Sequence, residues 1–205
     1  MSMRQRNWTR EELILAFNLY CKIPYGTFHN RNPKIIELAI LINRTPDALA
    51  YKLSNFASFD PYHKGRGVKG MQNASKLDKI IWDEFNSNWD DLIFESEQIL
   101  AAKQKTTLEK KYKPDLEHLG NKKGEYRAAE IKARVNQDFF RKVILSIYNY
   151  RCAVSGIDIP DMLIASHIIP WAENEKERLN PHNGICLSPL YDKCFDRGGH
   201  VKYFV

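Results

Sequence analysis

The sequence predicts an α+β chain, with a helical N-terminal region followed by a small C-terminal unit of two strands and one helix. Up to about residue 100, apolar residues recur at spacings of three and four, which is typical of amphipathic helices. Beyond residue 150, the runs Leu163 to Ile169 and Asn183 to Leu187 read as strands, and Pro189 to Arg197 as a short helix. We therefore expect a helical domain at 1–100, a basic linker at 101–126 and a second domain at 127–205.

Helix starts are marked along the N-terminal region. Thr9 and Glu12 have the spacing of a capping box, and Ser75 precedes a further helix with an acidic residue three positions later. Thr45 followed by Pro46 is typical of an N-cap with proline at the first helical position. Three short helices over the first 60 residues are therefore predicted, with another amphipathic helix after residue 75.

The third of these helices is a candidate for reading DNA. The arrangement resembles a helix-turn-helix or Myb-like unit, in which one helix enters a groove. Tyr51 and Asn55 lie four residues apart, opposite the apolar face, in line with Asp47 and beside Lys52. These side chains are the predicted base contacts. A three-helix unit that serves only for packing is the alternative.

The composition is that of a folded protein with an uneven charge. Of 205 residues, 43% are apolar, and the net charge is +6. Residues 101–151 hold 13 lysines and arginines against 6 acids, whereas residues 83–97 hold six acids and no base. The basic stretch indicates a polyanionic partner or a solvated helical face. With neither a membrane-length apolar run nor a signal peptide, a cytoplasmic location is expected.

Two further features of the sequence, a glycine-rich loop and the cysteines, bear on phosphate contacts and on zinc binding. The loop from Lys64 to Gly70 is rich in glycine and base, so Arg66 and Lys69 are predicted phosphate contacts, with a plain connector as the alternative. The four cysteines form no C-x-x-C pair, so a structural zinc is not expected.

The C-terminal quarter carries the chemistry. His167 sits in the string Ser-His-Ile-Ile-Pro-Trp, Asn183 opens the second strand, and Asp192 and Asp196 lie one turn apart on the final helix. A histidine can activate water near neutral pH, and carboxylates favour magnesium or manganese over zinc. That combination can hydrolyse a phosphodiester.

The ordered set resembles the HNH endonucleases, and within them a bacterial restriction-type branch. The match rests on Cys-Ala-Val-Ser-Gly at 152–156 and on the strings around His167, Asn183 and Asp192. The resemblance implies a ββα-metal fold, a general base at His167, an orienting asparagine at Asn183 and metal ligands at Asp192 and Asp196. Ser166 departs from the acid or histidine that many members place before the base.

The resemblance also implies further roles. Nucleic-acid contacts are expected from Arg134, Arg141 and Arg197. The expected activity is Mg²⁺- or Mn²⁺-dependent cleavage of double-stranded DNA by a homodimer, in restriction or in defence directed at modified DNA. Alternatives are a non-catalytic DNA-binding regulator with a decayed HNH fold, and a homing or mobile-element nuclease. The final residues read as an interrupted strand, so a truncated chain is another expectation.

Overall fold

The computed structural model describes residues 6–65, 74–86, 88–112 and 125–198. It confirms the α+β class, since helices dominate and a two-stranded antiparallel sheet lies near the C-terminus. The chain divides into two compact units. The first comprises Met1–Cys21 with Tyr25–Lys132, and the second comprises Lys22–Pro24 with Ala133–Val205.

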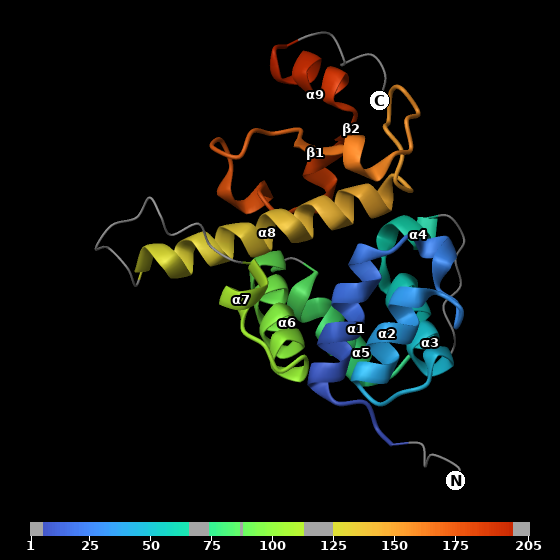
Figure 1. Cartoon of the computed structure of the whole chain (residues 1–205). Helices are drawn as coiled ribbons and strands as arrows, with labels where there is room; N and C mark the ends of the chain where they lie inside the picture. Colours follow the sequence, from blue (N-terminus) through green and yellow to red (C-terminus); the bar gives the residue numbers. More distant parts are fainter. Residues whose placement is uncertain (1–5, 66–73, 87, 113–124, 199–205) are drawn as a thin grey trace. The chain divides into compact units, whose positions relative to one another are not determined.

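The N-terminal unit is all helical (Figure 1). Its elements are α1 (Arg10–Lys22), a short 3₁₀ turn η1 (Tyr25–Thr27), α2 (Pro33–Leu41), α3 (Pro46–Phe59), α4 (Pro61–Gly65), α5 (Lys76–Phe85), α6 (Trp89–Lys103) and α7 (Leu108–Tyr112). The segment expected to be a linker at 101–126 thus includes the end of α6, the short α7 and the start of α8. Arg66 and Lys69 lie outside the described residues.

The helix starts follow the predicted capping residues. Thr9 and Glu12 exchange backbone and side-chain hydrogen bonds at 3.0 and 3.3 Å, so the predicted capping box is confirmed. Ser75 caps α5 in the same way, with Asp78 as its partner. The Thr45 side chain accepts from the backbone of Ala48 at 3.2 Å and begins α3. These bonds satisfy amide groups that have no partner within the helix.

α1 is the centre of the N-terminal unit, because every residue from Glu12 to Cys21 is buried. The Phe17 ring has no exposed surface and meets Phe56 and Trp82 at centroid distances of 5.0 and 5.2 Å. Glu12 is buried too, yet it stays charged. Burial acts to raise the pKa of this carboxyl, but bonds from Arg44, the Thr9 backbone and Arg6 outweigh burial and lower it.

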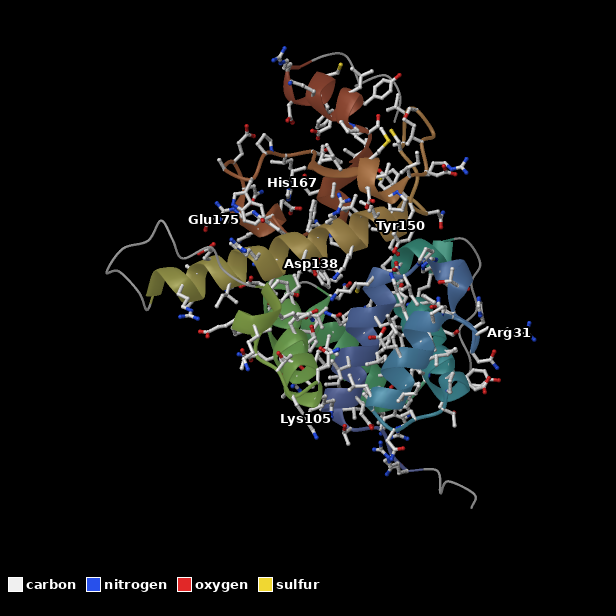
Figure 2. The ribbon with its side chains drawn as sticks, viewed as in Figure 1. Arg31, Lys105, Asp138, Tyr150, His167 and Glu175 are labelled. Carbon is white, nitrogen blue, oxygen red and sulfur yellow. The ribbon has the colours of Figure 1, made fainter. Side chains whose placement is uncertain are left out.

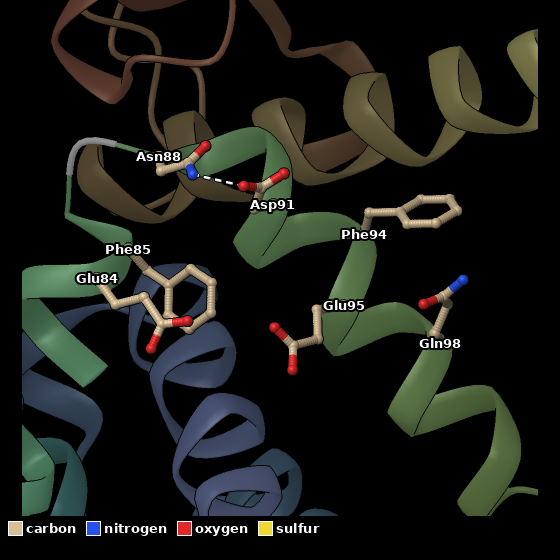
Figure 3. Close-up of a pocket in the computed structure, with 7 residues that line it drawn as sticks. All are labelled: Glu84, Phe85, Asn88, Asp91, Phe94, Glu95 and Gln98. Carbon is tan, nitrogen blue, oxygen red and sulfur yellow. Dashed lines mark hydrogen bonds between the residues drawn. The ribbon is translucent and has the colours of Figure 1, made fainter. Parts of the chain in front are cut away.

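A hollow of about 220 Å³ in the N-terminal unit is lined by acidic side chains (Figure 3). It lies where α5 and α6 meet, and Glu84, Asp91 and Glu95 are among its walls. Arg10 pairs with Glu84 and Glu95. This hollow holds much of the acidic stretch noted in the sequence, and its charge is the wrong sign for a nucleic acid.

The C-terminal unit places its small sheet between two helices (Figure 1). Helix α8 (Glu125–Ile147) enters it, followed by η2 (Pro160–Met162), β1 (Ile164–His167), η3 (Glu175–Glu177), η4 (Pro181–Asn183), β2 (Gly184–Leu187) and α9 (Pro189–Asp196). The strands are antiparallel, with His167 opposite Gly184 and Ile164 opposite Leu187. The predicted order of strand, loop, strand and helix is therefore confirmed.

A turn over residues 153–155 precedes the sheet, closed by a bond from the Gly156 amide to the Cys152 oxygen at 3.1 Å. Gly156 has φ +73°, a conformation that glycine adopts without steric cost.

Gly184 lets α8 pack directly against the sheet. A β-carbon at this position would lie 2.9 Å from the Phe140 ring and closer still to the side chain of Ile144. The absence of a side chain is therefore a packing requirement here. Across the described residues, no helix combines the length and the apolar character needed to cross a membrane.

Candidate functional site

His167, which Figure 2 labels, is the last residue of β1 and contacts two aromatic rings. Its imidazole lies parallel to the Phe140 ring at a centroid distance of 4.0 Å and meets the Trp171 ring edge-on at 5.5 Å. Its Nε2 lies 2.9 Å from the backbone oxygen of Arg178. Because a carbonyl oxygen only accepts, Nε2 is the protonated nitrogen. The neutral ring then keeps its lone pair on Nδ1.

Arg178 organises the other side of this cluster. Its Nε donates to the backbone oxygen of Trp171 at 2.8 Å, and its guanidinium lies 5.1 Å from the centre of the Trp171 ring. A contact with Glu175 at 3.2 Å adds to this arrangement. Arg178 thus fixes Trp171 with its side chain and His167 with its carbonyl group.

Asn183 joins two loop segments that border His167. Its Oδ1 accepts from the Ile169 amide at 2.7 Å, while its Nδ2 donates to the backbone oxygens of Ile169 and Glu177, each at 3.1 Å. The side chain is buried, so all these bonds are shielded from water. Asn183 makes no bond to the imidazole itself. It holds the residues on either side, including the one that precedes Arg178.

The two acidic candidates lie on α9. Asp192 accepts a hydrogen bond from the Ser166 hydroxyl, which joins the start of α9 to β1. Asp196 follows one turn later and is exposed. Among the residues that the structure describes, no three or more histidine, cysteine or acidic side chains gather as a metal cage. Two carboxylates and a hydroxyl nevertheless fit magnesium, which is usually held by one or two carboxylates with water and phosphate oxygens.

The structure places the histidine and the carboxylates on opposite faces of the sheet. Neighbouring residues in a strand point in opposite directions. Accordingly, Ser166 reaches Asp192 on α9, whereas His167 stacks on Phe140 of α8. In the described part of the chain, no hydrogen bond links His167 with Asp192.

The buried thiol of Cys152 joins two backbone segments of the C-terminal unit. The Cys152 sulfur accepts from the backbone amides of Ser155 and Ser188 at 3.3 and 3.2 Å. Burial acts to raise the pKa of this thiol, but the hydrogen bonds from Ser155, Val154 and Ser188 outweigh it and lower the pKa to about 7. Burial and the nearby Cys152 raise the pKa of Cys186 to about 11. Cys152 therefore acts as an anchor between the turn and the start of α9.

Two of the predicted DNA contacts on α3 are buried inside the N-terminal unit. Lys52 and Asn55 are 9% and 6% exposed, and both bond to the fully buried Asp78. Lys52 Nζ lies 2.8 Å from both carboxylate oxygens, and the Asn55 amide donates at 3.1 Å. α5 covers the part of α3 that holds Lys52 and Asn55, so these two side chains belong to the core of the N-terminal unit.

The other predicted nucleic-acid contacts fall in different settings. Tyr51 is 54% exposed on α3, and Arg197 is exposed at the end of α9. Arg134 is half-buried on α8. Arg141 uses its guanidinium on the backbone oxygens of Leu163 and Pro160, so it holds the segment before β1. Of the predicted contacts that fall within the described residues, Tyr51 and Arg197 are therefore the exposed ones.

The fold and the site together define a nuclease-type ββα unit: a strand ending in histidine, a second strand that begins after asparagine, and a helix that carries two aspartates. Residues 152–199 match the family model described as HNH endonuclease, so the C-terminal part of this chain is an HNH domain. Neither the search of curated proteins nor that of solved structures found a match.

Proposed function

We propose that this chain is a metal-dependent DNA endonuclease in which His167 is the general base. The observation that best supports this proposal is the bond between His167 Nε2 and the Arg178 backbone oxygen, which leaves Nδ1 as the proton acceptor. Phe140 and Trp171 fix the plane of the ring. A base held in one orientation removes the proton from an attacking water more effectively than a mobile one.

Asp192 and Asp196 are the proposed metal ligands, with magnesium or manganese as the proposed ion. Their oxygen donors suit these hard cations, and the hydroxyl of Ser166 orients the Asp192 carboxylate. A divalent cation held there would supply Lewis acidity toward the phosphate and the leaving oxygen. Because His167 and Asp192 lie on opposite faces of the sheet, the cut strand is expected to pass across the end of β1.

That same separation favours a second candidate, a DNA-binding regulator whose HNH domain has lost its activity. The small number of ligands around Asp192 points the same way, since Ser166 stands where many family members place an acid or a histidine. The two candidates differ in one respect that can be measured. An active nuclease stops cutting DNA when His167 is substituted, whereas a regulator does not cut DNA in either form.

The test compares the wild type with His167→Ala on plasmid DNA in magnesium, manganese or chelator. A general base contributes roughly 10²- to 10⁴-fold to the rate, so the variant should lose cleavage by that factor. His182→Ala, which removes an exposed histidine of the same domain, is the matched control and should keep full activity. Equal activity of wild type and His167→Ala would reject the assignment of the base.

The biological role that we propose is restriction or defence against modified DNA, with a homing or mobile-element role as the alternative. Running the same assay on methylated and unmethylated DNA separates these roles, because methylation is required by a modification-dependent enzyme and blocks an ordinary restriction enzyme. Cutting both strands requires two sites, so a homodimer is the expected active form. Light scattering in the presence of DNA measures this directly.

A further inference from the structure

A hollow of about 360 Å³ opens beside the imidazole of His167. Its volume is within the range of small-molecule sites, roughly 300–1,000 Å³. Phe140, Ile164, Ala165 and Trp171 give it apolar walls. All of these residues belong to the C-terminal unit, so the hollow is complete within the HNH domain and the helix that supports it.

The chemistry of the walls selects the occupant. Among the described residues that line the hollow, Arg141 is the only permanently charged one, and its guanidinium bonds to the backbone oxygens of Leu163 and Pro160. A phosphate would therefore meet mainly apolar surface in this described lining. The Gln137 side chain at the rim is exposed, and an amide offers both a donor and an acceptor. This lining suits a flat, neutral heterocycle with polar edges.

We propose that this hollow receives a nucleobase that has left the DNA stack next to the bond to be cut. The inference rests on the proposed function, since His167 borders the hollow and would stand beside the scissile phosphate. Trp171 provides the stacking surface: it is 37% exposed, and Arg178 fixes both its backbone and its ring. Aromatic rings bind displaced bases by stacking, and an amide reads the exposed base edge.

This arrangement has a measurable consequence for substrate choice. Displacing a base from an intact duplex costs unstacking and unpairing energy, and that cost is lowest where the base is already unpaired. The protein should therefore bind DNA with an unpaired base more tightly than fully paired DNA, by about tenfold or more. Tight binding should also require the unpaired base itself, and not merely the flexible DNA backbone at that point.

The experiment measures binding of the full-length protein to two labelled duplexes in chelator, which prevents cleavage. One duplex carries a single-nucleotide bulge, prepared with each of the four bases. The other carries an abasic bulge at the same position, so that the two differ only in the presence of a base. The wild type should bind at least one base-bearing bulge about tenfold more tightly than the abasic bulge.

Ala165→Leu fills the hollow from β1 and should remove most of that difference. Ala153→Leu is the matched control, because it makes the same change at an exposed position of the same unit, and it should leave the difference intact. Gln137→Ala should change which base is preferred while stacking persists. Circular dichroism and thermal melting verify that the variants are folded.

Equal affinity of the wild type for base-bearing and abasic bulges would overturn the proposal, as would a difference that survives in Ala165→Leu. A dimer that dissociates in Ala165→Leu but not in Ala153→Leu would overturn it too, by showing that a second copy fills the hollow. None of these readouts needs catalysis. A protein that discriminates the bulges but never cuts would reject the nuclease proposal and retain the base pocket.

Discussion

Helix α3 of the N-terminal unit and the β1–β2 region of the C-terminal unit both present polar residues that the sequence singled out, but the structure uses them differently. On α3, Lys52 and Asn55 are buried against Asp78 and cannot face a groove. Near the sheet, Asn183 is equally buried, yet its bonds hold the loop segments around His167. The helical spacing of polar residues identifies a polar face of a helix, but it does not show which element covers that face. A motif that spans several elements also indicates which of those elements pack together.

The largest expected effect concerns the buried pair on α3. Asp78→Ala would leave Lys52 buried without its carboxylate, and such a change usually costs about 3–5 kcal/mol. It also removes the acceptor for Asn55 and for the backbone amide of Ser75. The free energy of unfolding measured with urea reports the loss.

Asp83→Ala is the matched control for this prediction. Asp83 is on the same helix and pairs with Lys79, but both side chains are more than half exposed. Surface pairs of this kind contribute about 0.3–0.5 kcal/mol. If Asp78→Ala proved as mild as Asp83→Ala, Lys52 would have moved to solvent, and its assignment to DNA would become tenable again.

The second prediction tests the loop tie in the C-terminal unit. Asn183→Ala strands the Ile169 amide and two backbone oxygens, and each buried polar group left without a partner costs about 1–3 kcal/mol. Asn183→Asp keeps the acceptor for Ile169 but places a carboxylate oxygen against the Glu177 oxygen. We expect the cleavage rate of both variants to fall by more than their unfolded fraction explains. The reason is that His167 bonds to the backbone oxygen of Arg178, the residue next to the Glu177 oxygen that Asn183 holds.

Cleavage rates per folded molecule, together with unfolding curves, separate the two effects. A loss of activity that merely follows the unfolded fraction would reduce Asn183 to a structural residue. A larger loss in fully folded protein would support its positioning of the base.

The sequence predicted those parts of the fold and site that depend on local chemistry. Thr45 and Ser75 begin helices because their hydroxyls cap them, and the predicted order of strands and helix is present. It could not predict the partners of His167, since Phe140 and Arg178 reach it only after α8 and the loop fold against β1. The burial of Lys52 could not be predicted either, because its partner Asp78 reaches it only after α5 packs against α3.

Gly184 is a clear case of such a hidden contact, and it carries the third prediction. The sequence places it in the strand predicted from Asn183 to Leu187, with no sign of its neighbours, but the structure packs Phe140 and Ile144 where a β-carbon would stand. Gly184→Ala should destabilise the C-terminal unit by about 1–3 kcal/mol through overpacking. Adding Ile144→Val should recover part of the loss, and thermal melting of the two variants tests this. No recovery would place the strain elsewhere.

The smallest expected effect is a dependence of stability on pH that is confined to the C-terminal unit. The folded pKa of Cys152 is about 7, below its ordinary value of 9.0, so the folded state binds fewer protons than the unfolded state between these values. Stability should then rise on the order of 1 kcal/mol from pH 7 to pH 9 and be lost as the pH falls through 7. Cys186, with a pKa raised to about 11, acts in the opposite sense, so its contribution is lost between pH 9 and pH 11. Urea unfolding in reducing buffer at pH 7, 8, 9 and 10 should therefore show a maximum near pH 9. Cys152→Ala should abolish the rising limb and keep the falling one, whereas a rise that persists in Cys152→Ala would mean that another group binds the proton.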